Sequence, residues 1–222
     1  MRHFFYLHGL ASSPRSGKAC YLAEQFAARG LELHRPDLNE PDFSTLTTSR
    51  MIGQVADALR RLPPAPAVLV GSSLGGFVAL HLAERAPAEL PAHPVERLVL
   101  LAPALDFGAP GMRQRRADWF AGWQRDGWTE VEHHAYGETR RLHFGLIADA
   151  ARYDSFAVRT RVPTLICQGR GDEVVDPAMV QRFADPRAHV RLVLLDDDHR
   201  MAGSSDRIWA ETAAFVGLES GR

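Results

Sequence analysis

The sequence has little of what would direct a protein toward export, membranes or nucleic acid. Its 222 residues include only two cysteines, Cys20 and Cys167. Both fall in segments expected to be helix or buried strand, so we interpret them as thiols rather than a disulfide pair. No apolar run approaches the roughly 20 residues that cross a bilayer. The formal net charge of -1 offers no long-range attraction for nucleic acid or an anionic membrane, so we expect neither as a partner.

Lysine is scarce as well, because Lys18 is the only lysine among 26 basic residues. We interpret this as a compositional preference for arginine without functional meaning. The chain passes within a few residues from Met1 into a predicted strand, so we expect no signal peptide and a cytoplasmic protein. Hydrophobic residues make up 45% of the chain. This is enough for one substantial core, and we expect a single domain over residues 1–222.

Apolar runs and helical segments alternate along the chain, a pattern typical of an α/β fold with a doubly wound, mostly parallel sheet. The expected strands lie near residues 3–8, 31–36, 67–71, 96–102, 163–168 and 190–195. The expected helices lie near residues 16–29, 45–61, 75–85, 177–184 and 205–217. Gly30 closes the first helix in this interpretation, and Pro87 and Pro91 follow the third.

A Gly-x-Ser-x-Gly pentapeptide, residues 71–75, links the third strand to the third helix. A serine on such a sharp turn adopts a strained backbone, so the positions two before and two after it must lack bulk. Here both positions are glycine, Gly71 and Gly75. The pattern makes Ser73 the candidate nucleophile, whereas the same glycines in a plain strand-to-helix turn are the alternative.

A candidate acid and base follow in the order serine, aspartate, histidine. Asp172 comes after the fifth strand and His199 after the sixth. His199 is expected to take the Ser73 proton and later protonate the leaving group, while Asp172 holds the imidazole tautomer. The acid is the least certain member, because three aspartates at 196–198 precede His199 and Asp176 follows Asp172. Asp176 is expected to cap the next helix.

The segment Tyr6-Leu7-His8-Gly9-Leu10 ends the first predicted strand. A tetrahedral intermediate needs backbone N–H donors from two directions, and we expect them from Leu74, the residue after the nucleophile, and from Leu10. We expect His8 to shape this loop through hydrogen bonds rather than to transfer protons.

Over nearly its whole length the chain resembles α/β-hydrolase-fold proteins of the serine esterase type. The motifs are His8-Gly9-Leu10, the pentapeptide with Gly76, Gly171-Asp172 and Asp198-His199. The opening residues 6–14 with Lys18 also resemble small bacterial YqiA/YcfP-like esterases. The resemblance implies a sheet ordered 2-1-3-4-5-6 and no cofactor.

Residues 106–160 interrupt the strand and helix alternation after the fourth strand, where α/β hydrolases insert a cap. We expect this cap over the active site, with a substrate pocket lined by Trp119, Phe120, Trp123 and Trp128, unless these aromatics only bury the cap against the body. Nearby arginines, which attract an acidic substrate or face solvent, are Arg113, Arg115, Arg116, Arg140 and Arg141.

Two other segments do not match the ligand-binding motifs that they resemble. Residues 12–19 lack the first glycine and the final hydroxyl residue of a phosphate-binding loop. His133, His134 and His143 have no recognisable metal-ligand spacing, so we expect solvated loop histidines and no metal.

The sequence therefore predicts a serine hydrolase that cleaves a small carboxylic ester through an acyl-enzyme. Thioester, amide or peptide hydrolysis by the same residues remains open, as does a non-catalytic protein of this fold that binds a small ligand. A dehalogenase is disfavoured because its nucleophile would be an aspartate at position 73.

Overall fold

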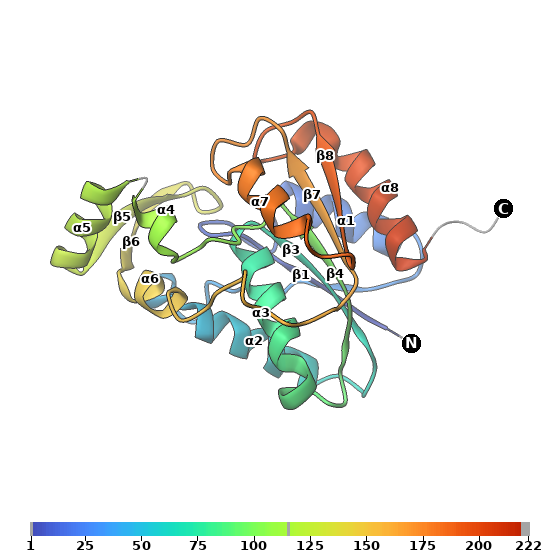
Figure 1. Ribbon diagram of the computed structural model, residues 1–222. Coiled ribbons are helices and arrows are strands. Elements are labelled where there is room, and N and C mark those ends of the chain that lie inside the picture. The colour runs from blue at the N-terminus through green and yellow to red at the C-terminus, as the bar shows by residue number, and fades with distance from the viewer. Residues whose placement is uncertain (1, 115, 219–222) are drawn as a thin grey trace.

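A computed structural model describes residues 2–114 and 116–218. Its main sheet has six parallel strands in the order β2-β1-β3-β4-β7-β8 (Figure 1). This confirms the predicted fold class and strand order. The strands are β1 (His3–Leu7), β2 (Leu33–His34), β3 (Ala67–Ser72), β4 (Val95–Leu101), β7 (Thr164–Gly169) and β8 (Val190–Leu195).

Helices cover both faces of this sheet (Figure 1). They are α1 (Gly17–Ala27), α2 (Thr48–Arg60), α3 (Leu74–Glu89), α7 (Pro177–Ala184) and α8 (Ser205–Val216). One hydrophobic cluster joins one sheet face to α2, α3 and α7, and a second joins the other face to α1 and α8. Every residue of β1, β3 and β7 is buried, because helices cover both faces of these parallel strands, and most of their side chains are apolar.

Two helix boundaries differ from the sequence prediction by three residues or more. The chain before α2 forms a separate 3-10 turn at Phe43–Thr45, and α2 begins only after its cap, Thr47, whose side chain accepts from the N–H of Arg50. The third helix extends to Glu89, so Pro87 lies inside it and does not follow it. A proline in the last turn of a helix removes a single hydrogen bond, and the buried Ala83 and Ala86 hold this turn against the core.

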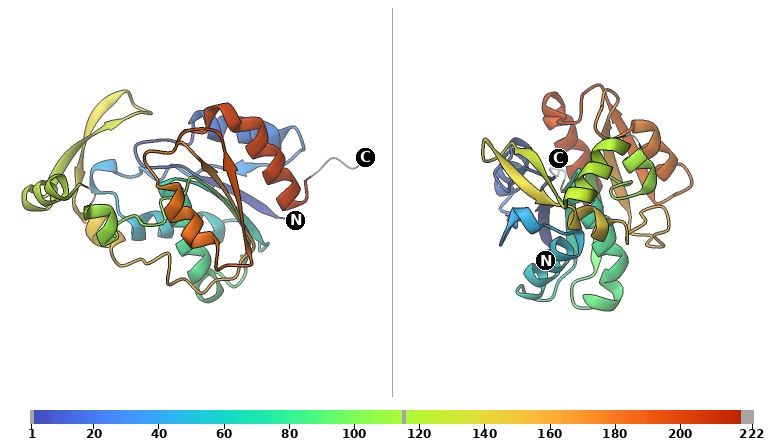
Figure 2. Two further views of the ribbon diagram at one scale, coloured as in Figure 1. Left: turned by 45° about the horizontal axis from the view of Figure 1, so that its top comes forward. Right: turned by 90° about the vertical axis from the view of Figure 1, so that its left-hand side faces the viewer.

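The segment between β4 and β7 forms three short helices and a hairpin. The helices are α4 (Pro110–Gln114), α5 (Ala117–Asp126) and α6 (Gly145–Ala150), and the hairpin pairs β5 (Trp128–His133) with β6 (Glu138–His143). The hairpin and α5 project from the carboxyl ends of the main strands (Figures 1 and 2). The sequence prediction placed no strands in this segment, so the hairpin was not predicted.

Hydrogen bonds fasten this insertion to the body at two places. Ser49 of α2 donates its N–H and its hydroxyl to the Asp149 carboxylate of α6, both at 2.7 Å. At the hairpin turn, the Ala135 N–H donates to Ala11 O at 3.4 Å. The amide of the buried Asn39 donates to Ser12 O at 2.8 Å and to the Tyr136 hydroxyl at 3.4 Å. The insertion thus touches the loop that follows β1.

No helix in the described ranges 2–114 and 116–218 is long and apolar enough to cross a membrane.

Candidate active site

Ser73 occupies the turn between β3 and α3 with a strained backbone. Its φ of 53° and ψ of -117° lie in a region that side-chain-bearing residues seldom adopt. The surrounding main chain holds this conformation: Ser73 N–H donates to Leu101 O at 2.9 Å, and Ser73 O accepts from Gly76 and Ala104 at 2.9 and 3.2 Å. The serine side chain is partly exposed. A hydroxyl held out of a buried strand end in this way is accessible to a substrate.

The glycines around Ser73 are required by close backbone packing. A Cβ on Gly71 would overlap Gly75 O, and a Cβ on Gly75 would overlap the carbonyl oxygen of Leu7. A Cβ on Gly76 would stand 2.9 Å from the Pro103 side chain. The start of α3 therefore lies directly against the end of β1, and this contact brings the loop after β1 beside the serine.

Asp172 and His199 are in direct contact. Asp172 Oδ2 accepts from His199 Nδ1 at 2.8 Å. The Asp172 side chain is fully buried, whereas that of His199 is 23% exposed. An ionised carboxylate bound to Nδ1 holds the imidazole proton on that nitrogen and leaves Nε2 able to accept a proton, which is the arrangement of a general base.

Four donors fix the orientation of the Asp172 carboxylate. Oδ1 accepts from the backbone N–H groups of Val174 and Val175 at 2.9 and 2.8 Å, while Oδ2 accepts from Gln168 Nε2 and from His199, both at 2.8 Å. Burial alone would raise the pKa of Asp172, but the hydrogen bonds from His199, Val175 and Gln168 outweigh it and leave this pKa below its ordinary value. The carboxylate is thus ionised at neutral pH.

The other four aspartates near the base make different contacts. Asp196 is exposed and pairs with Arg170 at 3.1 Å. Asp197 accepts from the Ser204 hydroxyl, and Asp198 accepts from the backbone N–H groups of two residues that follow His199. Asp176 caps α7 by accepting from Ala178 N–H at 2.8 Å.

The main chain joins the acid loop to the base loop. Arg170 N–H donates to Leu195 O at 2.8 Å and Gly171 N–H donates to Asp197 O at 3.0 Å. A Cβ on Gly169 would stand 2.5 Å from the carbonyl oxygens of Asp197 and Asp198. The glycine at the end of β7 therefore lets the two loops pack together, which sets the distance between Asp172 and His199.

Two free backbone donors lie next to Ser73. Among the described residues, neither the Leu10 N–H nor the Leu74 N–H has a hydrogen-bond acceptor. Leu74 is the first residue of α3, where N–H groups have no partner within the helix. The loop of Leu10 adjoins the nucleophile, because a Cβ on Gly9 would stand 3.2 Å from Ser73 Cβ and 3.8 Å from Ser73 Oγ. Unpaired donors from two segments are what an oxyanion requires.

His8 stabilises the loop after β1 through hydrogen bonds of its ring. It is buried, its Nε2 accepts from the Leu38 N–H at 3.0 Å, and its Nδ1 donates to Gly9 O at 2.9 Å. Both ring nitrogens are thus engaged with backbone. Asp37 Oδ1 lies 3.3 Å from Nε2 and accepts from the Asn39 N–H at 3.0 Å.

Ser73 and His199 are not hydrogen-bonded to each other in this structure. The two side chains come from the carboxyl ends of β3 and β8, the end of a parallel sheet where α/β proteins bind ligands. A nucleophile and base in a ligand-free site often stand farther apart than in the reacting complex.

The four aromatic residues predicted to line a substrate pocket differ in burial and location. Phe120 and Trp123 are buried in the hydrophobic cluster that also joins α2, α3 and α7 to the main sheet, and Trp123 Nε1 donates to Leu142 O at 3.0 Å. Trp119 packs between them, and Trp128 lies at the far end of the hairpin against His143. Of these four candidates, only Phe120 lines the cavity of about 290 Å³ between α4 and α5.

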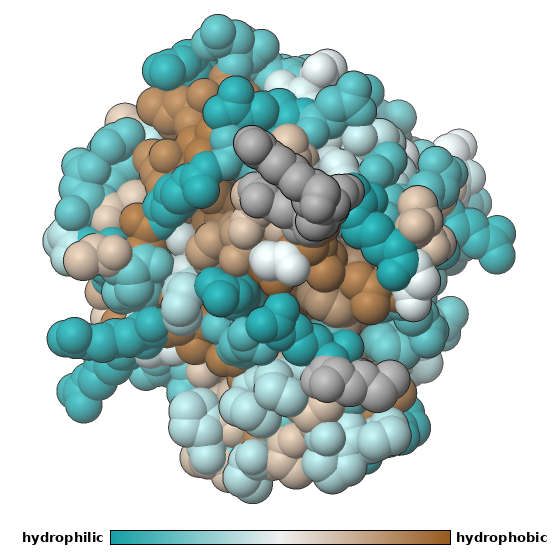
Figure 3. Space-filling view, turned by 90° about the vertical axis from the view of Figure 1, so that its right-hand side faces the viewer, coloured by the Kyte–Doolittle hydropathy of each residue, from teal (hydrophilic) through white to brown (hydrophobic). Residues whose placement is uncertain are grey.

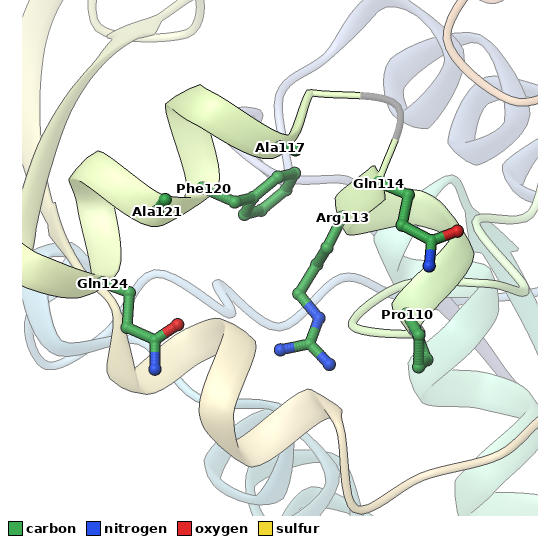
Figure 4. Close-up of a pocket in the computed structure, with 7 residues that line it drawn as sticks. All are labelled: Pro110, Arg113, Gln114, Ala117, Phe120, Ala121 and Gln124. Carbon is green, nitrogen blue, oxygen red and sulfur yellow. The ribbon is translucent and has the colours of Figure 1, made fainter.

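Figure 4 shows this cavity, with the Arg113 guanidinium extending from α4 into the space below Phe120. Arg113 Nε is buried without a hydrogen-bond partner among the described residues. Arg116 and Arg141 lie over the Trp119 and Trp128 rings, and Arg140 pairs with Glu138. Arg115 lies outside the described residues. The use of this cavity by a substrate stays a prediction.

The three histidines of the insertion do not gather. His133 and His143 stand at opposite ends of the hairpin. His133 is fully buried and stacks on Tyr136 at 3.8 Å, whereas His134 is exposed beside Glu132. The solvated-loop expectation is therefore wrong for His133, which the hairpin turn packs against the body.

Gln168 also contacts the candidate site, although its place in the sequence predicts no role for it. It is the buried penultimate residue of β7, and its amide bridges Asp172 and Gly169 O. The only signal in the sequence was a polar residue at the end of an otherwise apolar strand.

This sheet order, with a strained serine after β3 and an aspartate–histidine pair after β7 and β8, defines an α/β-hydrolase-fold protein. The chain belongs to the uncharacterised protein family UPF0227, whose model matches residues 3–216. No curated protein matches the sequence.

Solved structures of hydrolases share the fold. A protein from Agrobacterium vitis S4 designated a hydrolase has a TM-score of 0.81 at 25% identity, covering 97% of this chain and 88% of that chain. Mouse alpha/beta hydrolase domain-containing protein 10 has a TM-score of 0.78 at 21% identity, covering 98% and 90%. A structure from the metagenome-derived lipolytic enzymes LipS and LipT has a TM-score of 0.73 at 20% identity, covering 97% and 93%.

Proposed function

We propose that the protein is a serine hydrolase that cleaves carboxylic esters of small molecules through Ser73, His199 and Asp172. The observation that carries the proposal is the buried Asp172 carboxylate, bound to Nδ1 of a partly exposed histidine at the same sheet edge as a strained, accessible serine. The lipolytic neighbours support ester chemistry by analogy of fold.

In the proposed reaction, Ser73 Oγ attacks the ester carbonyl carbon while His199 Nε2 accepts the hydroxyl proton. The free N–H groups of Leu10 and Leu74 bind the oxyanion, and the imidazolium returns its proton to the departing alcohol. A water molecule, deprotonated by His199, then attacks the acyl-enzyme and releases the acid and the free serine. Asp172 stays ionised throughout and stabilises the imidazolium.

Activity-based labelling tests the nucleophile. A fluorophosphonate probe should modify Ser73 alone, and Ser73→Ala should lower ester turnover by roughly 10³-fold or more while the fold is kept. Ser72→Ala is the matched control, because Ser72 is the buried neighbour on β3, and it should retain labelling. Modification of a different serine in the intact protein would exclude the assignment.

The substrate class is tested with a panel of chromogenic esters, thioesters and aminoacyl amides. We expect the highest kcat/KM for esters. A preference for thioesters or amides would keep the three residues and change the substrate, because the chemistry is shared. Failure of both labelling and turnover in the folded protein would favour a non-catalytic protein of this fold that binds a ligand.

A further inference from the structure

A second groove lies at the opposite end of the sheet from Ser73. It is formed by residues 158–161, which lead into β7, and by residues 186–189, which lead into β8. Its volume is about 890 Å³, within the range of small-molecule sites. The molecular face toward the start of the strands is covered largely by hydrophilic side chains around apolar areas (Figure 3).

The side chains that line this groove carry positive charge and no negative charge. Arg159, Arg161, Arg187 and His189 contribute the ionisable groups, and the remaining residues are Val158, Thr160, Pro186 and Ala188. Within the described ranges, none of the three guanidinium groups has a carboxylate oxygen within 4.0 Å. Three arginines thus line one groove without a carboxylate counterion among the described residues, and a bound anion would supply the missing negative charge.

Arg187 is held rigidly in this arrangement. Its Nη1 donates to Phe183 O at 2.7 Å and its Nη2 donates to Phe156 O at 2.8 Å. The guanidinium also lies 4.1 Å from the centre of the Phe183 ring. These neutral contacts orient the group without cancelling its charge, so little side-chain entropy remains to be lost when an anion binds.

The acidic groups around the groove are already engaged. Glu84 on α3 accepts from the backbone N–H groups of Arg159 and Thr160 at 3.0 and 2.7 Å. Asp185, at the end of α7, accepts from Gln181 Nε2, and Asp154 accepts from Phe156 N–H at 2.8 Å. Glu84 therefore fixes the loop backbone, while the arginine side chains are left to face the groove.

We propose that this groove binds a phosphorylated small molecule through its phosphate groups. Arginine forks match the oxygens of phosphate in geometry and in charge. The volume accommodates a molecule larger than a single phosphate. The groove lies at the start of β7 and β8, away from the candidate catalytic residues, so a ligand bound there would not contact them.

His189 reports on the charge inside the groove. Its pKa is lowered, first by burial and then by the charges of Arg187 and Arg161. A bound polyanion offsets those charges and favours the protonated imidazole. Saturation with ligand should therefore raise the His189 pKa, measured by NMR titration of the imidazole. The nearby carboxylates of Glu84, Asp154 and Asp185 are present in both the free and the bound protein.

Calorimetry of the full chain with inorganic triphosphate at pH 7 and low salt tests the proposal. Arg159→Gln/Arg161→Gln is the informative variant, because both side chains are exposed and make no hydrogen bond among the described residues. We expect affinity to fall at least about 30-fold and the His189 pKa to stop responding to triphosphate. Ester turnover should stay within about twofold of wild type.

The matched control is Arg61→Gln/Arg116→Gln, which removes two exposed charges elsewhere. It should change triphosphate affinity by less than about threefold, as expected for long-range charge alone. The proposal is overturned if the wild type does not bind triphosphate at low salt, if both double variants lose affinity equally, or if hexaglutamate binds as tightly as triphosphate.

Discussion

The most demanding test of the candidate site is Asp172→Asn, because the structure determines which way the new amide must face. The Val174 and Val175 N–H groups both donate to Oδ1 at 2.9 and 2.8 Å. Only the amide oxygen can replace Oδ1 there, so the new NH2 group takes the place of Oδ2, opposite His199 Nδ1. Reversing the amide would set its NH2 against two backbone donors, at a cost of about 1–3 kcal/mol for each.

Gln168 reinforces this orientation. Its Nε2 donates to Asp172 Oδ2 in the native site, and its own Oε1 is buried without a partner among the described residues. Rotation of the Gln168 amide in the variant would turn Oε1 toward the new NH2 group. The NH2 then also donates to His199 Nδ1, and the imidazole proton moves to Nε2. Nε2 can no longer accept the Ser73 proton.

We therefore expect Asp172→Asn to lower kcat by about 10⁴-fold, equivalent to roughly 5–6 kcal/mol of transition-state stabilisation. Steady-state kinetics on a chromogenic ester measures the loss, and imidazole ¹⁵N shifts of His199 report the tautomer. Controls are Asn replacements at Asp196, Asp197 and Asp198, each expected to cost about tenfold or less, since an Asn oxygen keeps accepting in the turn. A kcat within tenfold of wild type, or an unchanged His199 tautomer, would refute the reasoning.

Two further predictions concern stability. Gly75→Ala should unfold the protein or lower its free energy of unfolding by about 3 kcal/mol or more in urea titrations, because the new Cβ overlaps Leu7 O. The control is Gly53→Ala in α2, where a Cβ meets nothing within 4 Å, and it should be neutral or stabilising by up to about 1 kcal/mol. Equal effects of the two substitutions would contradict the steric argument. Burial, helped by the charge of Arg85, lowers the pKa of His81 to about 4. Below about pH 6.5 the His81 imidazole is therefore protonated in the unfolded chain but stays neutral in the native state. The free energy of unfolding should fall by about 2–3 kcal/mol between pH 7 and 4.5. His81→Gln should lose that part of the acid sensitivity, and a pH dependence equal to the wild type would count against it.

The main sheet was predictable because its signals are local and strong. Parallel strands buried on both faces appear as short continuous apolar runs, and α7 begins and ends at the predicted residues, with Asp176 as its cap and Pro177 at its first position. The predicted triad residues follow strand ends, so the topology alone brings them to one edge of the sheet.

The insertion was harder because its strands do not alternate cleanly. In β6 only Leu142 is buried, and the other five residues are exposed. Such a strand is indistinguishable from a polar loop until its partner is known, since cross-strand pairs and the Trp123 bond to Leu142 O stabilise it. Pro87 misled the prediction for the opposite reason: tertiary packing of α3 outweighs a local signal for helix termination.

The contact between the β7 and β8 loops determines which carboxylate faces His199, the point on which the sequence left the choice of Asp172 least certain. In the sequence, Asp197 and Asp198 stand closest to His199. In the fold, Gly171 N–H is tied to Asp197 O, which turns the Asp197–Asp198 backbone toward the acid loop and their side chains toward turn donors. Asp172, 27 residues away, is the carboxylate left facing Nδ1. The same backbone contact holds Asp172 and His199 as one unit, so a substitution that breaks it should disturb both residues together.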